Sequence, residues 1–377
     1  MFRMRTVGYA ITAPLLTALV LAALLPAAAL LLAAALLTSA GGCSPAPAPS
    51  HPAVDPKVSL LATGDTGRRH RPFAKLLEGQ VAVGQEMARE DRQHPVDALV
   101  LLGDNFYWDG LRRAEMTERL RENLVFPYCH FLRLDGPRSA EVESACPLPP
   151  AQRHPVPLYA LLGNHDLMSE ESPSLQREAV AKFVPSWHMP AGTVEVVELG
   201  SGLSLVLFDS EAPRSQESQQ RLVLALAGSR GPWRVIAAHT PVAIGEEGGG
   251  LYLHNEEFVR YLYDAVERAG VPIHLYLSGH HHSQQLLELP GENPPLHVIA
   301  GGGARFRPIR EEHPARRYGA SELGFARVDV TGSGDSERLV VSLFRAPTLP
   351  VLSKGAAELV ARWSVDSQGR TRDELSP

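Results

Sequence analysis

The segment that decides the fold is Val58-Ser59-Leu60-Leu61-Ala62-Thr63-Gly64-Asp65-Thr66-Gly67, in which a short apolar run ends in a glycine and a carboxylate. A short apolar run bounded by turn residues predicts a buried strand. The glycine allows a sharp exit from that strand. The carboxylate therefore falls at the carboxyl end of the strand, which is where open α/β sheets bind their ligands.

Similar apolar runs recur along the chain. Further buried strands are predicted at 98–102, 158–162, 203–208, 234–238, 274–277 and 297–300. Between them, the patterns at 73–92, 216–227 and 255–269 predict helices. Residues 324–344 are typical of a hairpin, and 354–363 carry a modest helical pattern. Because strands alternate with helices, the sequence predicts a layered α/β fold.

Four more of these runs end in polar residues: Gly103-Asp104-Asn105-Phe106-Tyr107, Gly163-Asn164-His165-Asp166, His239-Thr240-Pro241 and Gly279-His280-His281-His282. We expect these side chains to converge at one edge of the fold. Their types sort into two metal sites. One is rich in anionic oxygen, from Asp65, Asp104 and Tyr107 with one imidazole. The other joins Asn164 to two imidazoles and shares Asp104 as a bridge.

Tyr107 indicates which kinds of ion the pair contains. A tyrosine hydroxyl has an ordinary pKa near 10. It ligates well only when the metal removes its proton, which a trivalent ion does best. Imidazole suits divalent zinc, manganese or iron. The pattern therefore predicts an unequal pair, with one trivalent and one divalent ion.

The five blocks together resemble the calcineurin-like metallophosphoesterase superfamily, over roughly Val58 to Gly303. Tyr107 narrows the resemblance to the purple acid phosphatases, and the wording of Gly103 to Tyr107 is closest to their small, tartrate-resistant type. The resemblance implies a β-sandwich flanked by helices. It also implies a ferric ion on Asp65, Tyr107 and His282, and a divalent iron, zinc or manganese ion on Asn164, His239 and His280, with Asp104 bridging.

In the same resemblance, His165 contacts the phosphate and protonates the leaving group. Asp166 either orients the His165 ring or serves in a plain salt bridge. The sequence departs from the small type at Leu167 and His281, where histidine and aspartate are frequent. Strand alternation predicts that His281 points away from both ions. These changes leave the metal ligands intact, so the resemblance does not extend to substrate preference and pH optimum.

The resemblance implies a metal-dependent phosphoester hydrolase of the acid phosphatase kind. We expect phosphomonoesters to be cleaved by a water that two metal ions activate. Phosphodiester or nucleotide hydrolysis by the same site is the alternative. A non-catalytic binding lipoprotein is a third, against which the intact ligand set argues. The net charge of -6 and the lack of a basic patch predict no nucleic-acid partner.

The N-terminal region is expected to lie outside the fold. Arg3 and Arg5 precede a stretch rich in Leu and Ala over residues 10–37, and small residues then lead to Cys43. This resembles a bacterial lipobox, which implies a signal over 1–42 and a lipid anchor at Cys43 in the cell envelope. An uncleaved membrane anchor and an ordinary cleaved signal remain as alternatives.

The remaining divisions follow from composition. Residues 43–57 are rich in Pro and Ala and are expected to form a tether, 58–347 the catalytic domain and 348–377 a tail. Residues 127–157 are Pro-rich and are expected to form a surface insertion. Cys129 and Cys146 lie within it, and an oxidising compartment predicts that they pair. The glycine-rich segment 246–250 is expected to be a surface loop, with a role at the pocket mouth as an alternative.

Overall fold

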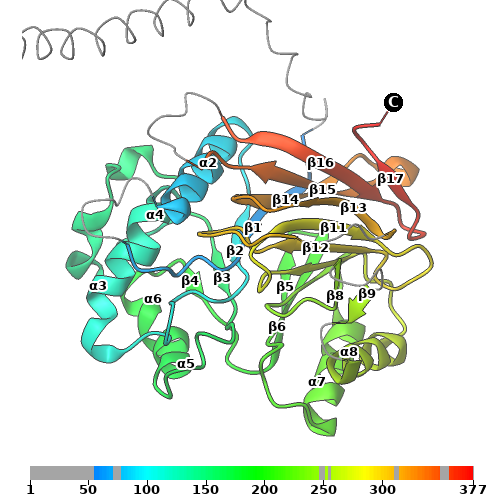
Figure 1. Cartoon of the computed structure of the whole chain (residues 1–377), viewed down its shortest axis with the longest axis horizontal. Helices are drawn as coiled ribbons and strands as arrows, with labels where there is room; N and C mark the ends of the chain where they lie inside the picture. Colours follow the sequence, from blue (N-terminus) through cyan, green and yellow to red (C-terminus); the bar gives the residue numbers. More distant parts are fainter. Residues whose placement is uncertain are drawn as a thin grey trace, which may run out of the picture. The chain divides into compact units, whose positions relative to one another are not determined.

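Two β-sheets form the centre of the protein. The computed structural model describes residues 55–70, 78–245, 251–253, 256–309, 314–348 and 356–376. The first sheet has eight strands in the order β17-β16-β15-β14-β1-β2-β3-β4, and the second has seven in the order β13-β11-β12-β10-β7-β6-β5. A separate two-stranded ribbon joins β8 and β9. The expected layered sandwich flanked by helices is confirmed (Figure 1).

Both sheets are mixed. In the first sheet β1, β2 and β3 are parallel neighbours, while β14 runs antiparallel to β1. In the second sheet β6, β7, β10 and β12 are parallel neighbours. The strands are β1 (Val58–Thr63), β2 (Ala98–Leu101), β3 (Leu158–Ala160), β4 (Trp187–His188), β5 (Val194–Leu199), β6 (Leu203–Phe208), β7 (Trp233–Ala237), β8 (Ala243–Gly245), β9 (Leu251–Leu253), β10 (Leu275–Ser278), β11 (Gln284–Glu288), β12 (Leu296–Ala300), β13 (Arg316–Ala320), β14 (Gly324–Thr331), β15 (Arg338–Arg345), β16 (Glu358–Val365) and β17 (Thr371–Asp373).

Helices cover the outer face of each sheet (Figure 1). They are α2 (Gly79–Gln93), α3 (Met116–Leu120), α4 (Phe126–Tyr128), α5 (Ser172–Ser174), α6 (Val180–Phe183), α7 (Gln216–Gly228) and α8 (Glu256–Ala269). Helices α2 to α6 pack on the first sheet, and α7 and α8 on the second. The long insertion of helical turns between β2 and β3 therefore thickens one side of the sandwich.

Strand β1 shows why the central runs are continuously apolar. Leu60 and Ala62 point into the core between the two sheets, where they meet residues such as Leu205 and Leu277. Leu61 points to the opposite face and packs under the helices of the first sheet. Because both faces of such a strand are buried, apolar residues do not alternate with polar ones along it. Its ends are consequently marked only by the glycines and polar residues that follow.

Most predicted elements are confirmed, with boundaries that shift by one or two residues. Helix α7 begins at a capping box on Ser215, and α8 ends at Gly270, which has a φ of 65°. The described part of the predicted helix at 73–92 is α2. The predicted helix at 354–363 is wrong, because residues 358–365 form strand β16, which pairs antiparallel with β15. Backbone pairing with a sheet edge outweighed a modest helical pattern there.

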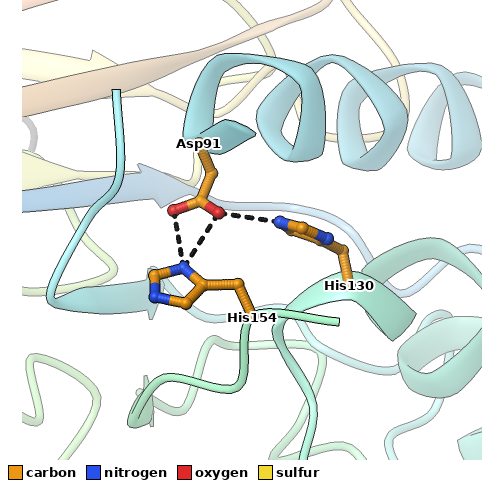
Figure 2. A group of neighbouring side chains, drawn as sticks. All are labelled: Asp91, His130 and His154. Carbon is orange, nitrogen blue, oxygen red and sulfur yellow. Dashed lines mark hydrogen bonds and ion pairs between the residues drawn. The ribbon is translucent and has the colours of Figure 1, made fainter. Parts of the chain in front are cut away.

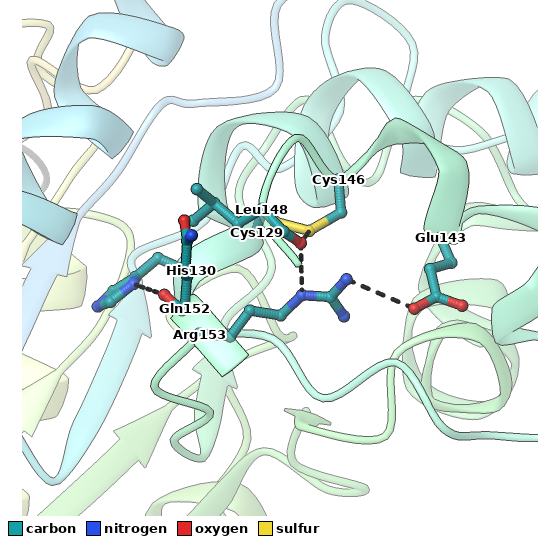
Figure 3. Close-up of a disulfide and its surroundings, with 7 residues drawn as sticks. All are labelled: Cys129, His130, Glu143, Cys146, Leu148, Gln152 and Arg153. Atoms are coloured by element: carbon teal, nitrogen blue, oxygen red, sulfur yellow. Dashed lines mark hydrogen bonds and ion pairs between the residues drawn. A yellow bond between two sulfur atoms is a disulfide. The ribbon is translucent and has the colours of Figure 1, made fainter. Parts of the chain in front are cut away.

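The insertion is confirmed as a unit closed by a disulfide between Cys129 and Cys146, whose Cα atoms are 5.2 Å apart (Figure 3). Arg153 supports the same loop. Its Nε donates to the carbonyl oxygen of Leu148 at 3.0 Å, and its guanidinium pairs with Glu143 at 3.4 Å. The segment is thus held by a covalent link and by polar contacts across its base.

Within the residues that the structure describes, no helix is long and apolar enough to cross a membrane. The predicted signal, the tether up to residue 54, Cys43 and the loop at 246–250 lie outside those residues.

Candidate metal centre and active site

The predicted site residues follow the carboxyl ends of five strands. Asp65 follows β1, the block with Asp104 and Tyr107 follows β2, and Asn164 follows β3, all in the first sheet. His239 follows β7, and His280 and His282 follow β10, both in the second sheet. The site is therefore assembled where the strand ends of the two sheets meet.

Three of these residues have an unusual backbone. Asp65, Asp104 and His280 have φ values of 60°, 54° and 67°, and they are the only non-glycine residues with positive φ in the described chain. Such conformations cost roughly 1–3 kcal/mol each and persist where the surrounding structure fixes them. Their concentration at one site indicates that the position of these side chains matters more than local stability.

Glycines provide the space that the side chains need. A Cβ on Gly163 would lie 2.3 Å from Asp104 Oδ1, and a Cβ on Gly103 would lie 2.5 Å from His239 Nδ1. Gly103 also has a φ of 86°. The glycines that precede Asp104 and Asn164 in the sequence are thus required by close approach as well as by the turn.

The first group of side chains is formed by Asp65, Tyr107 and His282. Tyr107 Oη donates to Asp65 Oδ1 at 2.9 Å and also lies 2.9 Å from His282 Nε2. His282 Nε2 lies 3.3 Å from Asp65 Oδ1. All three side chains are buried. Three potential ligand atoms therefore face one point, as the ligand set of a single ion requires.

The second group is formed by Asn164, His239 and His280. Asn164 Oδ1 lies 3.2 Å from His239 Nε2 and 3.0 Å from His280 Nδ1, and the two ring nitrogens are 3.2 Å apart. His239 Nδ1 donates to the carbonyl oxygen of Leu102 at 2.8 Å. That bond orients the ring and leaves Nε2 to face the group, which is how metal-binding histidines are usually held.

Asp104 joins the two groups. Its Oδ1 lies 3.6 Å from His239 Nε2, and candidate ligand atoms of Asp65, Asp104 and His239 all lie within 4.8 Å of one another. Burial raises the pKa of Asp104, and the charge of Asp65 adds to the increase. Burial opposes the positive form of His239, but the carboxylates of Asp104 and Asp65 raise the pKa of that ring to about 9. The carboxylates of Asp65 and Asp104 therefore give the cluster a negative charge that bound cations would neutralise.

His165 lies at the edge of this cluster and is half-buried. Its backbone N–H donates to Asp104 Oδ1 at 2.9 Å, and its Nδ1 contacts the carbonyl oxygen of Trp108 at 2.8 Å. A carbonyl can only accept, so Nδ1 carries the proton and Nε2 is free for other contacts. The Tyr107 ring packs beside it, with centroids 4.5 Å apart.

Asp166 does not contact the His165 ring, so the first of its two expected roles is wrong, and among the described residues no cation forms an ion pair with it either. Asp166 is fully buried and accepts hydrogen bonds of 3.0 Å from the backbone N–H groups of Asn105, Phe106 and Gly163. Gln176 Nε2 donates to it at 2.9 Å. Burial, followed by the charge of Asp104, raises the pKa of Asp166 to about 6. Asp166 thus links the loops after β2 and β3 by hydrogen bonds. The carbonyl of Trp108, rather than Asp166, orients the His165 ring.

A pocket of about 460 Å³ opens onto the cluster. Its walls include Asp104, Asn164, His165, His280, His281, His282, Ser283, Arg307, Pro308 and Ile309. His281 lines this pocket too, and its ring centroid lies 5.5 Å from that of His280. That its ring points away from both ions stays a prediction. Arg307 was not predicted. It follows β12 in a glycine-rich stretch, and glycines also follow other strands that lead to active-site residues. This pattern is the sequence signal from which Arg307 could have been predicted.

Exposed apolar side chains lie in or against the loops that carry His165 and Arg307, two residues of the pocket wall, and we call them the apolar rim. Trp108 is 48% exposed and Met168 is 62% exposed. Phe306, next to Arg307, is also exposed, and the guanidinium of Arg305 lies over the Trp108 ring at 5.4 Å. Large exposed apolar groups near a polar cleft are typical of a binding surface. Sequence patterns could not predict this rim, because it depends on which loops meet.

Comparison with solved structures supports the fold. GAP50, described as the anchor in the inner membrane complex of Plasmodium, matches with a TM-score of 0.56 and 16% identity over 80% of this chain and 89% of its own. A purple acid phosphatase from yellow lupin seeds matches with a TM-score of 0.54 and 16% identity, over 82% of this chain and 53% of its own. These matches support the fold, a sandwich of two sheets flanked by helices, on which the candidate ligand side chains converge.

The family follows from the sequence comparison. The chain belongs to the calcineurin-like phosphoesterase family, whose profile matches residues 58–284. Human tartrate-resistant acid phosphatase type 5 is 26% identical over 311 residues, which cover 73% of this chain and 85% of the relative. The predicted resemblance to the purple acid phosphatases is thereby confirmed. The chain is a metal-dependent phosphoester hydrolase.

Proposed function

We propose that the protein is an acid phosphatase-like enzyme that hydrolyses phosphomonoesters with two metal ions. The observation that carries this proposal is the pair of ligand groups that meet at Asp104 on the wall of one pocket. Asp65, Tyr107 and His282 would hold one ion. Asn164, His239 and His280 would hold the other, and Asp104 would bridge them.

The donor atoms fit an unequal pair of ions. Burial raises the pKa of Tyr107 well above its ordinary value, and the charges of Asp65 and Asp104 raise it further. The phenol keeps its proton in this environment unless a highly charged ion binds the oxygen and replaces that proton. Ferric iron meets that demand, whereas the amide and two imidazoles of the second group suit divalent iron, zinc or manganese.

The chemistry divides between the ions and the chain. Two bound ions would activate water and neutralise the phosphoryl oxygens. His165 lines the pocket beside Asp104, and in the doubly protonated form of its ring Nε2 can donate a proton to the leaving oxygen. The contact with the Trp108 carbonyl keeps the ring in one orientation while the proton moves. Arg307, on the pocket wall, supplies a positive charge for the anionic substrate.

The apolar rim supports a leaving group with an apolar or aromatic surface. Trp108 and Phe306 offer exposed rings on which such a group can pack. We expect an aryl phosphate to have a lower KM than glycerol phosphate, and Trp108→Ala to raise the KM of the aryl phosphate selectively. Equal KM changes for both substrates would contradict this role of the rim.

The decisive experiment compares p-nitrophenyl phosphate with bis(p-nitrophenyl) phosphate on the metal-loaded protein. We expect faster turnover of the monoester and loss of both activities in Asp104→Asn, which keeps the shape of the side chain. A preference for the diester would support the alternative, a phosphodiesterase or nucleotide hydrolase that uses the same site. Turnover of neither substrate by iron-loaded protein would overturn the proposal.

We also propose that the protein is exported and anchored in the cell envelope through a lipid on Cys43. The motive is the run of small residues before Cys43 and the Pro- and Ala-rich segment after it. The disulfide in the insertion is consistent with an oxidising compartment. Labelling with a palmitate analogue should mark the wild type and miss Cys43→Ser. Equal labelling of the two would rule out this anchor.

A further inference from the structure

A second cluster of potential metal ligands lies outside the active site. It consists of Asp91, His130 and His154, and Figure 2 shows both imidazole rings directed at the one carboxylate. His130 Nε2 lies 2.7 Å from Asp91 Oδ2. His154 Nδ1 lies 3.1 Å and 2.9 Å from the two carboxylate oxygens. Nothing in the active-site chemistry uses these residues.

The cluster lies at the opposite end of the strands from the active site. Asp91 is in the last turn of α2 and also accepts the backbone N–H of Val96, just before β2. His154 precedes β3, which runs parallel to β2. The active-site residues follow the other ends of these two strands. The cluster therefore requires an explanation of its own.

The ring orientation of His130 favours a shared cation. Its Nδ1 lies 3.3 Å from the carbonyl oxygen of Gln152, and a carbonyl can only accept, so that nitrogen carries a proton. In the neutral ring, Nε2 then presents its lone pair to the Asp91 carboxylate. This contact requires either a second proton on the ring or a cation shared by both groups. Metal-bound histidines have this arrangement, with the far nitrogen donating to a carbonyl.

The surroundings also suit an ion. Asp91 and His130 are buried, while the side chain of His154 is 45% exposed, which leaves room for a water as a further ligand. The carboxyl end of α2 favours positive charge. In tetrahedral zinc sites, ligands at about 2.0–2.2 Å from the ion are roughly 3.3 Å apart. The ligand atoms here need to separate by only about half an ångström.

We propose that Asp91, His130 and His154 bind a divalent transition-metal ion of the zinc type. The ion would be structural rather than catalytic. His130 and His154 stand near the two ends of the insertion, and Asp91 belongs to α2, so the ion would fasten the base of the insertion to the helix. It would act beside the Cys129–Cys146 disulfide, which closes the loop between them.

The test counts metal ions in the full-length protein. The purified protein is loaded with zinc, desalted and analysed for iron and zinc per chain. We expect the wild type to carry one zinc more than His154→Gln and one more than Asp91→Asn. Phosphatase turnover should be unchanged in both variants, which reports correct folding. Zinc should also raise the Tm of the wild type more than that of either variant.

His188→Gln is the matched control, because His188 is equally exposed and pairs with Glu195 at 2.8 Å without a third ligand. It should keep the wild-type zinc content. A wild type with no zinc beyond its active-site ions overturns the proposal, and so does an equal zinc content in all four proteins. In those cases hydrogen bonds between Asp91 and the two imidazoles hold the cluster without an ion. Cobalt titration of the wild type gives an independent check through the visible bands of tetrahedral sites.

Discussion

At the scale of single residues, the site depends on where protons and charges are held. The residues that would bind the two ions are buried or half-buried, and His165 is the group that combines pocket access with a free ring nitrogen. Three of the candidate ligands, Asp65, Asp104 and His280, have a positive φ, whereas the His165 ring is held by one hydrogen bond to a backbone carbonyl. Its substitution should therefore disturb chemistry without disturbing the ligands.

His165→Ala should lower kcat by about 10²–10⁴-fold, the usual contribution of general acid–base catalysis. Metal content should be unchanged, because the backbone N–H of residue 165 can still donate to Asp104. Steady-state kinetics with metal analysis of the same sample checks both statements. An activated substrate such as p-nitrophenyl phosphate should lose less than an alkyl phosphate, since its leaving group needs less protonation. Loss of an ion would instead identify His165 as a structural residue.

Tyr107→Phe tests the metal pair. A phenolate bound to ferric iron gives a visible charge-transfer band, so the iron-loaded wild type should be coloured and the variant colourless. Phenylalanine keeps the ring that packs against His165, so the fold should be retained. The first ion should bind more weakly because Oη is lost from its group. An iron-loaded wild type without a visible band would show that Tyr107 is not a ligand.

Sequence reasoning succeeded for the residues that follow strands. Glycine followed by Asp, Asn or His at a strand end is a local pattern, and the topology brings such ends together. It failed for Asp166, whose role depends on which way its side chain points after the turn. Arg307 and the apolar rim were missed because they depend on contacts between loops, which no local pattern records.

At the scale of elements, the sandwich was predictable because its central strands are buried on both faces and read as continuous apolar runs. Strand β16 was not, since it lies near the edge of the first sheet and pairs with β15 and the short β17. Its burial is uneven, and its sequence carries a helical pattern that the sheet overrides. Edge elements take their structure from their neighbours more than from their own sequence.

The insertion offers a prediction at this scale. Replacing both cysteines, as in Cys129→Ser with Cys146→Ser, should destabilise the protein by about 3 kcal/mol in the chain-entropy picture for a loop of this size. Thermal unfolding should show a lower Tm for the double variant, and reductant should lower the Tm of the wild type alone. Mass spectrometry of unreduced peptides should find the cross-link. Two alkylated free thiols in the purified protein would contradict the disulfide.

At the scale of the whole molecule, the buried histidines away from the active site set a limit on acid stability. Burial lowers the pKa of His297 to about 4, and burial followed by the charge of Arg234 lowers that of His274 to about 4. His297 packs inside β12, and its Nε2 donates to the carbonyl oxygen of Pro294 at 3.2 Å. Neither ring can gain a proton without a cost to the folded state.

Stability should therefore fall as the pH drops from about 6.5 towards 4. In that window the unfolded chain binds protons at both histidines, whereas the folded chain does not, so protons favour unfolding. Above about pH 6.5 both states are neutral at these positions, and below about pH 4 both are protonated, so the loss levels off. One such histidine contributes up to about 3 kcal/mol across the window.

His297→Leu removes one of these groups and should reduce the fall in unfolding free energy between pH 6.5 and 4. Urea unfolding at several pH values measures the slope directly. His297→Leu also lacks the hydrogen bond to Pro294, which changes its stability at every pH. The unfolding free energy of each protein is therefore compared with its own value at pH 7.5. His188→Leu is the control and should keep the wild-type slope, because the His188 side chain is exposed. Parallel curves for wild type and His297→Leu would mean that His297 is protonated in the folded protein.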